Sequence, residues 1–308
     1  MAGALLNTLR LAKAGVVLAS HSVRFVPKDG PEPLPFKLAR IATLPVRIAA
    51  APFQWGKPRD KRISAALGAL GPSYIKLGQF LATRGDIIGP DLQSELSHLQ
   101  DRMPPFGMDE ARRAIESSLG GKLEDHFVEF GPPVAAASIA QVHKAVVVDG
   151  DERRTVAVKI LRPGIERRFK RDLDSYFFAA RLVERWHEPS RRLRPVAVVE
   201  NLARTTELEM DLRLEAAAMS EMAENLNPDE GFRVPRVDWR RTSKRVLVTE
   251  WIDGIPIGDK AGLTAAGFDI NTLGMTVIRS FLKHAMRDGF FHADMHQGNL
   301  FVDKAGTI

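Results

Sequence analysis

The first third of the chain carries a helical pattern of apolar and polar positions. From Asp91, which would cap the helix, leucines recur at intervals of four and three residues and share one helix face. These leucines are Leu92, Leu96 and Leu99. After a proline-containing break at 103–106, a second helix runs to about Leu119 and ends at Gly120-Gly121. The stretch 27–35 (PKDGPEPLP) has the composition of a linker.

Strand patterns follow in the middle of the chain. The segment 134–148 is rich in alanine and β-branched residues, and 155–161 (TVAVKIL) predicts a strand. A turn through Asp149-Gly150-Asp151 would join the two segments into a hairpin. The later elements are long helices at about 165–188 and 195–225, a strand at 245–251, one or two helices over 263–289, and a loop with a short strand over 290–303.

The composition indicates a globular protein. The 308 residues are 44% hydrophobic and 27% charged, which excludes a disordered or fibrous chain and predicts about two domains. The chain has no cysteine, so disulfide scaffolds, thiolate zinc sites and cysteine nucleophiles are excluded. The net charge is +6, with net charges of +8 over residues 1–62 and +6 over 151–194. These basic zones indicate an anionic partner, and the alternative is a solvated, arginine-rich surface.

The N-terminal segment is amphipathic. Arg10 and Lys13 interrupt its apolar residues, and the apolar run Ala14–Ala19 is too short to span a membrane. A helix lying on a membrane surface fits this pattern better than a cleavable signal peptide. A helix packed on the protein's own core is an equal alternative. No transmembrane helix is predicted anywhere in the chain.

Two features could hold phosphates. The small residues of the loop 134–142 (VAAASIAQV) would let the backbone approach a phosphate, although alanine runs are more commonly helix or core. Lys159 ends the apolar run Val-Ala-Val-Lys and would carry its charge to α- and β-phosphates in a nucleotide site. An ordinary edge-strand lysine is the alternative.

Acidic residues follow in the segment TELEMDLRLEAAAM. Asp211 and Glu215 are four residues apart and share a helix face, so their charges repel unless a cation lies near them. That cation could be Lys159 or a metal ion. A solvated acidic face is the alternative interpretation.

The last candidate is the segment HADMHQGN. Asp294 and Asn299 have the D-x-x-x-x-N spacing of a kinase catalytic loop, where the Asp orients or deprotonates the attacking hydroxyl and the Asn binds Mg²⁺. A metal cluster on His292, Asp294 and His296 is the competing interpretation, which lacks a further ligand motif.

The order of these features resembles the UbiB-type atypical kinases, a family linked to ubiquinone biosynthesis, from about residue 20 to the end. Its most specific motif is K-x-G-Q at Lys76 to Gln79. The resemblance implies that this helix restricts access to the active site, and that Glu209 and Asp211 (E-x-D) engage it. It also implies that Lys159 pairs with Glu215. The remaining implied positions are a catalytic base at Asp294, a Mg²⁺ ligand at Asn299, a hinge facing adenine at Glu250 and Ile252, and an alanine-rich nucleotide loop at Val134, Ala135, Ala136, Ala137, Ser138, Ile139, Ala140, Gln141 and Val142.

The implied fold is α+β, with a kinase-like N-lobe of β-sheet plus helices, a helical N-terminal extension and an incomplete C-lobe. The expected ranges are a membrane-proximal segment at 1–35, the K-x-G-Q extension at 36–120, the N-lobe at 121–254 and the start of the C-lobe at 255–308. The family's DFG Asp lies about 13 or 14 residues after the loop Asn, which is beyond Ile308. We therefore expect a fragment that binds Mg-ATP poorly, exposes C-lobe core surface and aggregates.

The expected function is that of an ATP- and Mg²⁺-using atypical kinase or ATPase supporting ubiquinone biosynthesis. The alternative is a non-catalytic scaffold that binds lipids or biosynthetic proteins. The family's older polyprenylphenol hydroxylase (monooxygenase) label has no supporting motif here. Expected partners are an anionic membrane surface, quinone-biosynthesis intermediates or enzymes, and a second copy of the chain. The expected location is the cytoplasmic face of the inner membrane. Nucleic acid is not expected, because the chain has few aromatic residues and no reader motif.

Overall fold

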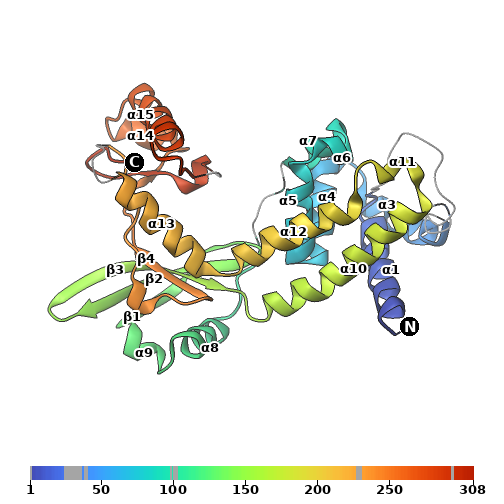
Figure 1. The fold of residues 1–308 in the computed structure, drawn as a ribbon, viewed down its shortest axis with the longest axis horizontal. Helices are drawn as coiled ribbons and strands as arrows, with labels where there is room; N and C mark the ends of the chain where they lie inside the picture. Colours follow the sequence, from blue (N-terminus) through green and yellow to red (C-terminus); the bar gives the residue numbers. More distant parts are fainter. Residues whose placement is uncertain are drawn as a thin grey trace. The chain divides into compact units, whose positions relative to one another are not determined.

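The computed structural model describes residues 2–23, 37, 41–97, 99, 103–226, 231–292 and 295–308. The fold is mixed α+β, as expected, with a four-stranded sheet and a helical N-terminal part (Figure 1). The chain forms two compact units. The helical unit comprises Met1–Phe106, Ala136–Ala140 and Arg162–Met210, and the sheet unit comprises Gly107–Ala135, Gln141–Leu161 and Asp211–Ile308.

The units are therefore not consecutive in sequence. The chain leaves the helical unit after Phe106, returns to it at the short turn Ala136–Ala140, and returns again at Arg162. These units are defined by contacts and do not test the four expected domain ranges, which stay a prediction. The expected linker at 27–35 lies outside the described residues.

The helical unit is built from amphipathic helices around buried leucine, isoleucine and alanine side chains. The leucine face expected near residue 95 is confirmed, because Leu96 and Leu99 are buried beside Ile63, Leu67 and Ile75. Asp91 does not cap this helix, which already begins at Pro90, a favourable first helical residue. The helices are α1 (Ala2–Ser20), α3 (Leu44–Gln54), α4 (Arg59–Leu70), α5 (Pro72–Ala82), α6 (Gly85–Ile88), α7 (Pro90–Ser97), α10 (Ile165–Trp186), α11 (Glu188–Arg191) and α12 (Pro195–Glu209).

Helix α1 has two different faces. Ala14 and Ala19 are buried, whereas Leu5 and Leu9 are more than half exposed. One face of the helix therefore packs on the protein itself, and contact of the other face with a membrane stays a prediction. No helix in the described residues is long and apolar enough to cross a membrane.

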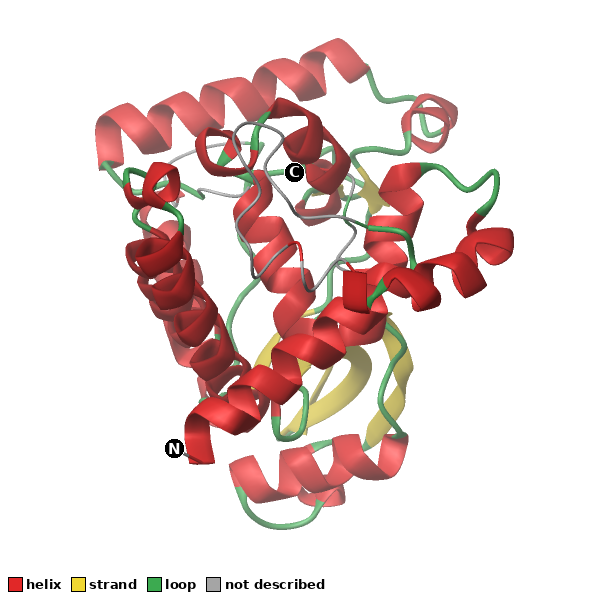
Figure 2. Cartoon of the chain, turned by 90° about the vertical axis from the view of Figure 1, so that its right-hand side faces the viewer, coloured by secondary structure: helices red, strands yellow, loops and turns green. Residues whose placement is uncertain are grey.

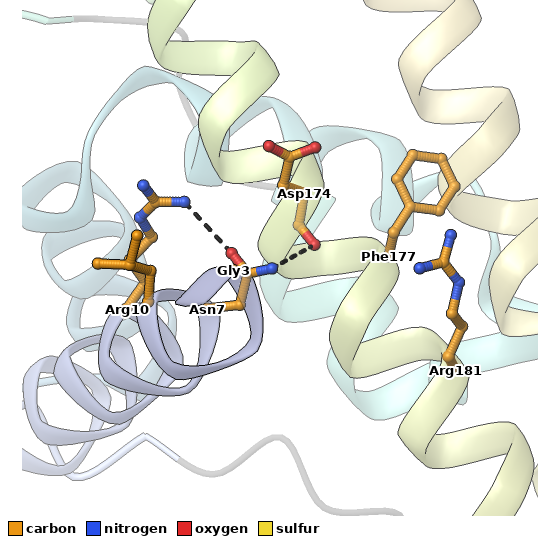
Figure 3. A pocket seen from close by; sticks show the side chains of 7 residues that line it. Gly3, Asn7, Arg10, Asp174, Phe177 and Arg181 are labelled. Carbon is orange, nitrogen blue, oxygen red and sulfur yellow. Dashed lines mark hydrogen bonds between the residues drawn. The ribbon is translucent and has the colours of Figure 1, made fainter. Parts of the chain in front are cut away.

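A hollow of about 420 Å³ lies where α1 packs on α10 (Figure 3). Arg10 donates to Asn7 Oδ1 at 3.2 Å, and Asn7 Nδ2 donates to the carbonyl of Asp174 at 3.4 Å. Phe177 and Arg181 of α10 form the other side of the hollow. The hydrogen bond from Asn7 attaches the N-terminal helix to α10, and Arg10 orients the Asn7 side chain.

The sheet unit contains a four-stranded sheet with strand order β1-β2-β3-β4, which is yellow in Figure 2. The strands are β1 (Glu129–Ala136), β2 (Ala140–Asp149), β3 (Glu152–Leu161) and β4 (Val246–Glu250). The expected hairpin is confirmed, since β2 and β3 flank a turn at Gly150, whose φ of 64° favours glycine. The helices and short elements are α8 (Met108–Leu119), α9 (Leu123–His126), α13 (Leu212–Leu226), η1 (Trp239–Arg241), β5 (Ile255–Pro256), α14 (Lys260–Ala265), α15 (Ile270–Lys283), η2 (His284–Asp288), η3 (Gln297–Asn299) and β6 (Phe301–Val302).

The alternation along β3 separates its two faces. Val156, Val158 and Ile160 are fully buried, whereas Lys159, between them in register with Leu247 of β4, stays half-buried. Helices α8 and α13 lie on opposite sides of the sheet (Figure 1). This alternation places the Lys159 side chain on the face away from the buried valines.

The predicted helix over 195–225 is wrong in one respect. It is divided at Met210–Asp211 into α12 and α13. The amide of Leu212 donates to the carbonyl of Lys244 at 3.0 Å, so a contact distant in sequence holds the start of the second helix. The spacing of apolar residues could not predict this break, because no glycine or proline interrupts the sequence there.

Candidate functional site

The ion pair between Lys159 and Glu215 is the main feature of the sheet unit. Lys159 Nζ lies 2.8 Å from Oε1 and 2.7 Å from Oε2 of Glu215. Strand β3 positions the lysine, and the first turn of α13 positions the glutamate. Both side chains keep solvent access, at 33% and 43%. The pair can therefore accept a further anion on the lysine without either charge being buried.

The structure resolves the cation question raised by the acidic segment. Glu215 pairs with Lys159, whereas Asp211 accepts from Arg213 Nε at 2.9 Å and NH2 at 2.6 Å. This hydrogen bond from Arg213 lowers the pKa of Asp211 below its ordinary value. The idea that Asp211 and Glu215 share one cation is therefore wrong. The partner of Asp211 lies two residues away, in the first turn of α13, which begins just after Asp211.

The alanine-rich segment divides into three parts. Val134 to Ala136 end β1, Ala140 to Val142 begin β2, and only Ala137 to Ile139 lie outside both strands. The amide of Ala137 donates to the carbonyl of Ala140 at 2.8 Å, so this amide is already used within the turn. The side chains from Ser138 to Gln141 are buried. Any contact of these four residues with a ligand would therefore come from their backbone.

Arg162, just after β3, holds this turn. Its backbone amide donates to Ile139 O at 2.8 Å, and its guanidinium donates to Ala137 O at 2.8 Å and Pro104 O at 2.9 Å. One arginine thus fixes two carbonyls of the turn. The sequence reasoning missed Arg162, because its targets are backbone carbonyls that leave no trace in a side-chain pattern.

The end of β4 carries the two residues expected in a hinge. Both carboxylate oxygens of Glu250 accept from Arg233 NH1 at 3.0 Å. The amide of Glu250 donates to Arg236 O, and the amide of Trp251 donates to Thr155 O. Ile252 is half-buried just beyond the strand. The Glu250 side chain therefore anchors the neighbouring segment, and a ligand would be met by backbone groups.

Asn299 lies in a tight turn. Its amide donates to His296 O at 3.0 Å, and His296 Nδ1 accepts from the amide of Gly298 at 3.0 Å. Asp294 lies outside the described residues, so its expected role and the competing metal cluster stay predictions. Within the described residues, no group of three His, Asp or Glu side chains could hold a metal ion.

The K-x-G-Q helix, α5, has its own ion pair in the helical unit. Lys76 Nζ lies 2.6 Å from Glu209 Oε2 at the end of α12. Gly78 packs against the neighbouring helices, since an added Cβ would lie 2.7 Å from Leu67 Cδ1. Gln79 is half-buried. The motif therefore combines a charged contact with a close helix approach, and what Lys76 and Gln79 do in function stays a prediction.

A buried polar cluster holds α5 on α10. Ser73 Oγ donates to Asp172 Oδ2, and Arg168 donates to Leu70 O at 2.8 Å. The rings of Tyr74 and Tyr176 meet edge to face at 5.2 Å. Burial, and then the charge of Asp172, raise the pKa of Tyr74 to about 12. The sequence reasoning missed this cluster, and the i, i+4 spacing of Arg168 and Asp172 was its only sequence signal.

Comparison with known proteins agrees with this geometry. The ABC1 atypical kinase-like domain family matches residues 98–308. A "Probable protein kinase UbiB" from Marinobacter nauticus is 44% identical over 246 residues, covering 80% of this chain and 44% of that protein. The corresponding protein of Aeromonas hydrophila is 42% identical, covering 86% and 49%. The chain thus spans about half the length of these curated relatives. Their names do not support the hydroxylase label.

A solved structure shares the fold. The Rv3197–erythromycin complex from Mycobacterium tuberculosis matches with a TM-score of 0.50 and 27% identity, covering 88% of this chain and 64% of that one. Because the family match spans more than half of the chain, and the relatives named above are UbiB kinases, the chain belongs to the ABC1 atypical kinase-like family and to its UbiB-type members.

Proposed function

We propose that the chain is the nucleotide-binding part of a UbiB-type atypical kinase or ATPase that supports ubiquinone biosynthesis. Family membership and the relatives' names support this proposal. The observation that carries it is the ion pair between Lys159 on β3 and Glu215 on α13. Kinases use such a strand lysine, held by a helix glutamate, to bind the phosphates of ATP.

The described residues fit the phosphates of ATP. Lys159 is one-third exposed, so a phosphate can reach its ammonium group while Glu215 keeps the side chain extended. The backbone near Ile252 would face the adenine. Asn299 would offer Mg²⁺ an amide oxygen, a ligand type that suits this ion, and Asp294 would be the base. Bound Mg²⁺ would neutralise phosphate charge.

We further propose, from the family resemblance, that Lys76 and Gln79 restrict access of protein substrates. This proposal rests on the family resemblance. The Lys76–Glu209 ion pair supports it, because the pair holds α5, the helix that contains Lys76 and Gln79. Hydrolysis of ATP, or transfer to a small or lipid acceptor, is then favoured over phosphorylation of proteins.

Calorimetric titration of ATP, with and without Mg²⁺, into the wild-type chain and its Lys159→Met variant tests the nucleotide site. We expect weak but saturable binding, as for a chain that binds Mg-ATP poorly. This binding should weaken by a further tenfold or so in the variant, because a charge-assisted contact to phosphate is lost. The Glu215→Gln variant should bind less tightly than wild type, since the lysine is no longer held. Lys260→Met, which removes an exposed lysine of α14, is the matched control and should bind like wild type.

Equal affinity of the wild type and Lys159→Met would contradict the proposed site, as would the absence of saturable binding to the wild-type chain. The biosynthetic role is tested separately by ubiquinone content. The chain, or its Lys159→Met variant, replaces the UbiB-type gene of a bacterium. We expect only the wild-type chain to maintain ubiquinone above the level of the deletion strain.

A second proposed activity is binding to an anionic membrane surface on the cytoplasmic side of the inner membrane. The supporting observation is the apolar exposure of α1 and α3, which pack on each other. Leu5, Leu9, Ile48 and Phe53 are more than half exposed, and Trp55 is 89% exposed. Exposed apolar and aromatic side chains beside basic residues are typical of helices that lie in a lipid interface. Quinone intermediates and other biosynthetic enzymes are proposed partners at this surface, and a second copy of the chain is a further one.

Sedimentation with vesicles tests the membrane proposal. Vesicles containing phosphatidylglycerol should retain the wild-type chain, and the double variant Leu5→Gln/Leu9→Gln should bind about tenfold less because apolar burial is lost. Leu208→Gln, at an exposed leucine of α12, is the control. Unchanged retention of the double variant would refute the surface.

A further inference from the structure

A hollow of about 390 Å³ in the helical unit has three arginines in its lining. It lies between the segment around α6 and the connection from α11 to α12 (Figure 1 labels the three helices). Arg84, Arg192, Arg194 and Asn201 contribute its polar wall, and Asp86 contributes the one carboxylate. The charged side chains of the lining therefore carry a net charge of +2. This volume falls in the range of small-molecule sites, about 300–1,000 Å³.

Arg84 is oriented at the edge of this hollow by Asp86. Its Nε and NH2 groups donate to the two carboxylate oxygens of Asp86 at 2.9 and 2.7 Å. This contact lowers the pKa of Asp86, so the carboxylate stays ionised and keeps the guanidinium in place. A guanidinium has five N–H donors, so Arg84 retains donors for a second partner.

Arg192 and Arg194 have no carboxylate partner among the described residues. Both side chains are exposed. The backbone around them is nevertheless well defined, because the amide of Arg194 donates to Arg191 O at 3.0 Å and the amide of Val198 donates to Arg194 O at 3.1 Å. Two unneutralised guanidiniums are thus carried on a hydrogen-bonded turn at one hollow.

Glu184, at the end of α10, forms no ion pair with Arg192 or Arg194 among the described residues. Glu184 Oε1 accepts from the amide of Val196 at 3.0 Å, which caps the first turn of α12. A backbone amide at the beginning of α12 therefore already donates to a carboxylate, so the helix N-terminus is not the proposed binding element. The cationic character comes from the arginine side chains.

We propose that this hollow binds a phosphate-bearing anion, a phosphomonoester or diphosphate group carried on a small organic or lipid body. Planar guanidiniums match the oxygens of phosphate and can donate two parallel hydrogen bonds to them. The Asn201 amide adds a neutral donor, and Leu193 and Val198 offer apolar contact to the remainder of the ligand. No step of the nucleotide-site proposal depends on this site.

Two soluble probes distinguish the sources of such a group. Pyrophosphate represents a free phosphate compound, and dihexanoyl phosphatidic acid below its micelle concentration represents a lipid headgroup. Both are titrated calorimetrically into the Lys159→Met chain, so that the proposed nucleotide site does not contribute. We expect saturable binding of at least one probe at physiological ionic strength. Tighter binding of phosphatidic acid would assign a lipid ligand, and tighter binding of pyrophosphate a soluble one.

The double variant Arg192→Gln/Arg194→Gln should weaken binding of the preferred probe by about tenfold or more. Asn201→Asp, an exposed and nearly isosteric change, should weaken it as well by adding a negative charge. The matched control is Arg167→Gln/Lys170→Gln, which removes the same charge from exposed positions of α10. Thermal unfolding of each variant verifies that the fold is intact.

The proposal is overturned if neither probe saturates, or if the double variant binds like its parent. It is also overturned if the α10 control loses as much affinity as the double variant, because the effect would then be general charge attraction. None of these outcomes bears on the affinity of the wild-type chain for ATP, so failure here and failure of the proposed nucleotide site are separable.

Discussion

Gly78 shows at the residue scale how a motif position is set by packing. A Cβ added there would lie 2.7 Å from Leu67 Cδ1 and 2.8 Å from Leu99 Cδ2, both of which belong to the buried cluster. Overpacking a core costs about 1–3 kcal/mol, whereas alanine gains about 1 kcal/mol over glycine in a helix interior. We therefore predict that Gly78→Ala lowers the free energy of unfolding by about 1 kcal/mol, measured by urea denaturation.

The matched control for this change is Gly68→Ala in α4. Apart from the chain neighbours and the nearby backbone of α4 itself, no atom lies within 4 Å of a Cβ added at Gly68. Only the gain in helix propensity applies there, so this variant should be stabilised by up to about 1 kcal/mol. Opposite signs for the two alanine variants are the expected result, and equal stabilisation of both would contradict the packing explanation.

Asp149, at the end of β2, gives a pH-dependent prediction. Hydrogen bonds from Arg241 and then Arg154 lower its pKa from 3.8 to about 2. A carboxylate with a lower pKa in the folded state stabilises the fold above its unfolded pKa, and the effect is lost as the pH falls through the folded pKa. The charge should therefore contribute fully above about pH 4, and its contribution should disappear as the pH approaches 2.

The variant Asp149→Asn tests this assignment. Its free energy of unfolding should fall less steeply than that of the wild type between about pH 5 and pH 2, since the titrating group is gone. Urea denaturation at several pH values measures the two profiles. Parallel profiles would show that Asp149 has the same pKa in the folded and unfolded chains.

Side-chain partners could be predicted from sequence only where a resemblance supplied them. Lys159 and Glu215 are 56 residues apart, and no local rule connects them. The family resemblance nevertheless implied the pair that the structure contains. Asp211 shows the opposite case, because its partner Arg213 is so close in sequence that helix-face reasoning passed over it.

At the scale of elements, the position of α5 depends on one buried carboxylate of α10. Asp172 is 9% exposed and accepts from Ser73 Oγ. Loss of one partner leaves a buried polar group unsatisfied, which costs about 1–3 kcal/mol. We predict a loss of this size for Asp172→Ala, measured as the free energy of unfolding. The ion pair of Lys76, on the same helix, should be weakened in turn.

The neighbouring Asp174 supplies the control for this prediction. Its side chain is exposed and has no partner among the described residues. Asp174→Ala should change stability by about 0.5 kcal/mol or less, the usual size for surface substitutions. Similar losses for both variants would mean that the Ser73–Asp172 contact does not hold α5.

Helices and strands with regularly spaced apolar residues could be predicted from the sequence, but the boundaries between consecutive elements could not. The leucine face of α7 and the apolar run of β3 follow directly from side-chain period, because burial rewards that spacing. The division between α12 and α13 depends on a backbone bond from Leu212 to Lys244. A contact made 32 residues away in sequence leaves no local signal.

At the scale of the whole molecule, the interleaving of the two units was beyond sequence reasoning. The turn Ala136–Ala140 belongs to the helical unit, although both flanking strands belong mainly to the sheet unit. Backbone hydrogen bonds from Arg162 and Met103 hold that turn. Linear domain ranges follow composition, whereas compact units follow contacts between distant segments.

The sheet unit also presents an apolar surface that bears on self-association. Met275, Ile278 and Leu282 recur along α15 at intervals of three and four residues and are each about half exposed, and Met286 is 84% exposed. The exposed core surface expected from the sequence has its best candidate in this stripe. A contiguous apolar stripe on a helix favours association with another apolar surface.

We predict that the purified chain associates as its concentration rises, and that Ile278→Lys/Leu282→Lys reduces the association. Both positions are exposed, so the lysines should not disturb the core, and their charges repel across a shared stripe. Sedimentation velocity at several concentrations measures the effect, with Leu214→Lys, an exposed leucine of α13, as control. A discrete dimer abolished by the double variant would assign the stripe as a self-interface, and larger species abolished by it would assign it as an aggregation site. A wild-type chain that stays monomeric throughout would show that the stripe does not drive association.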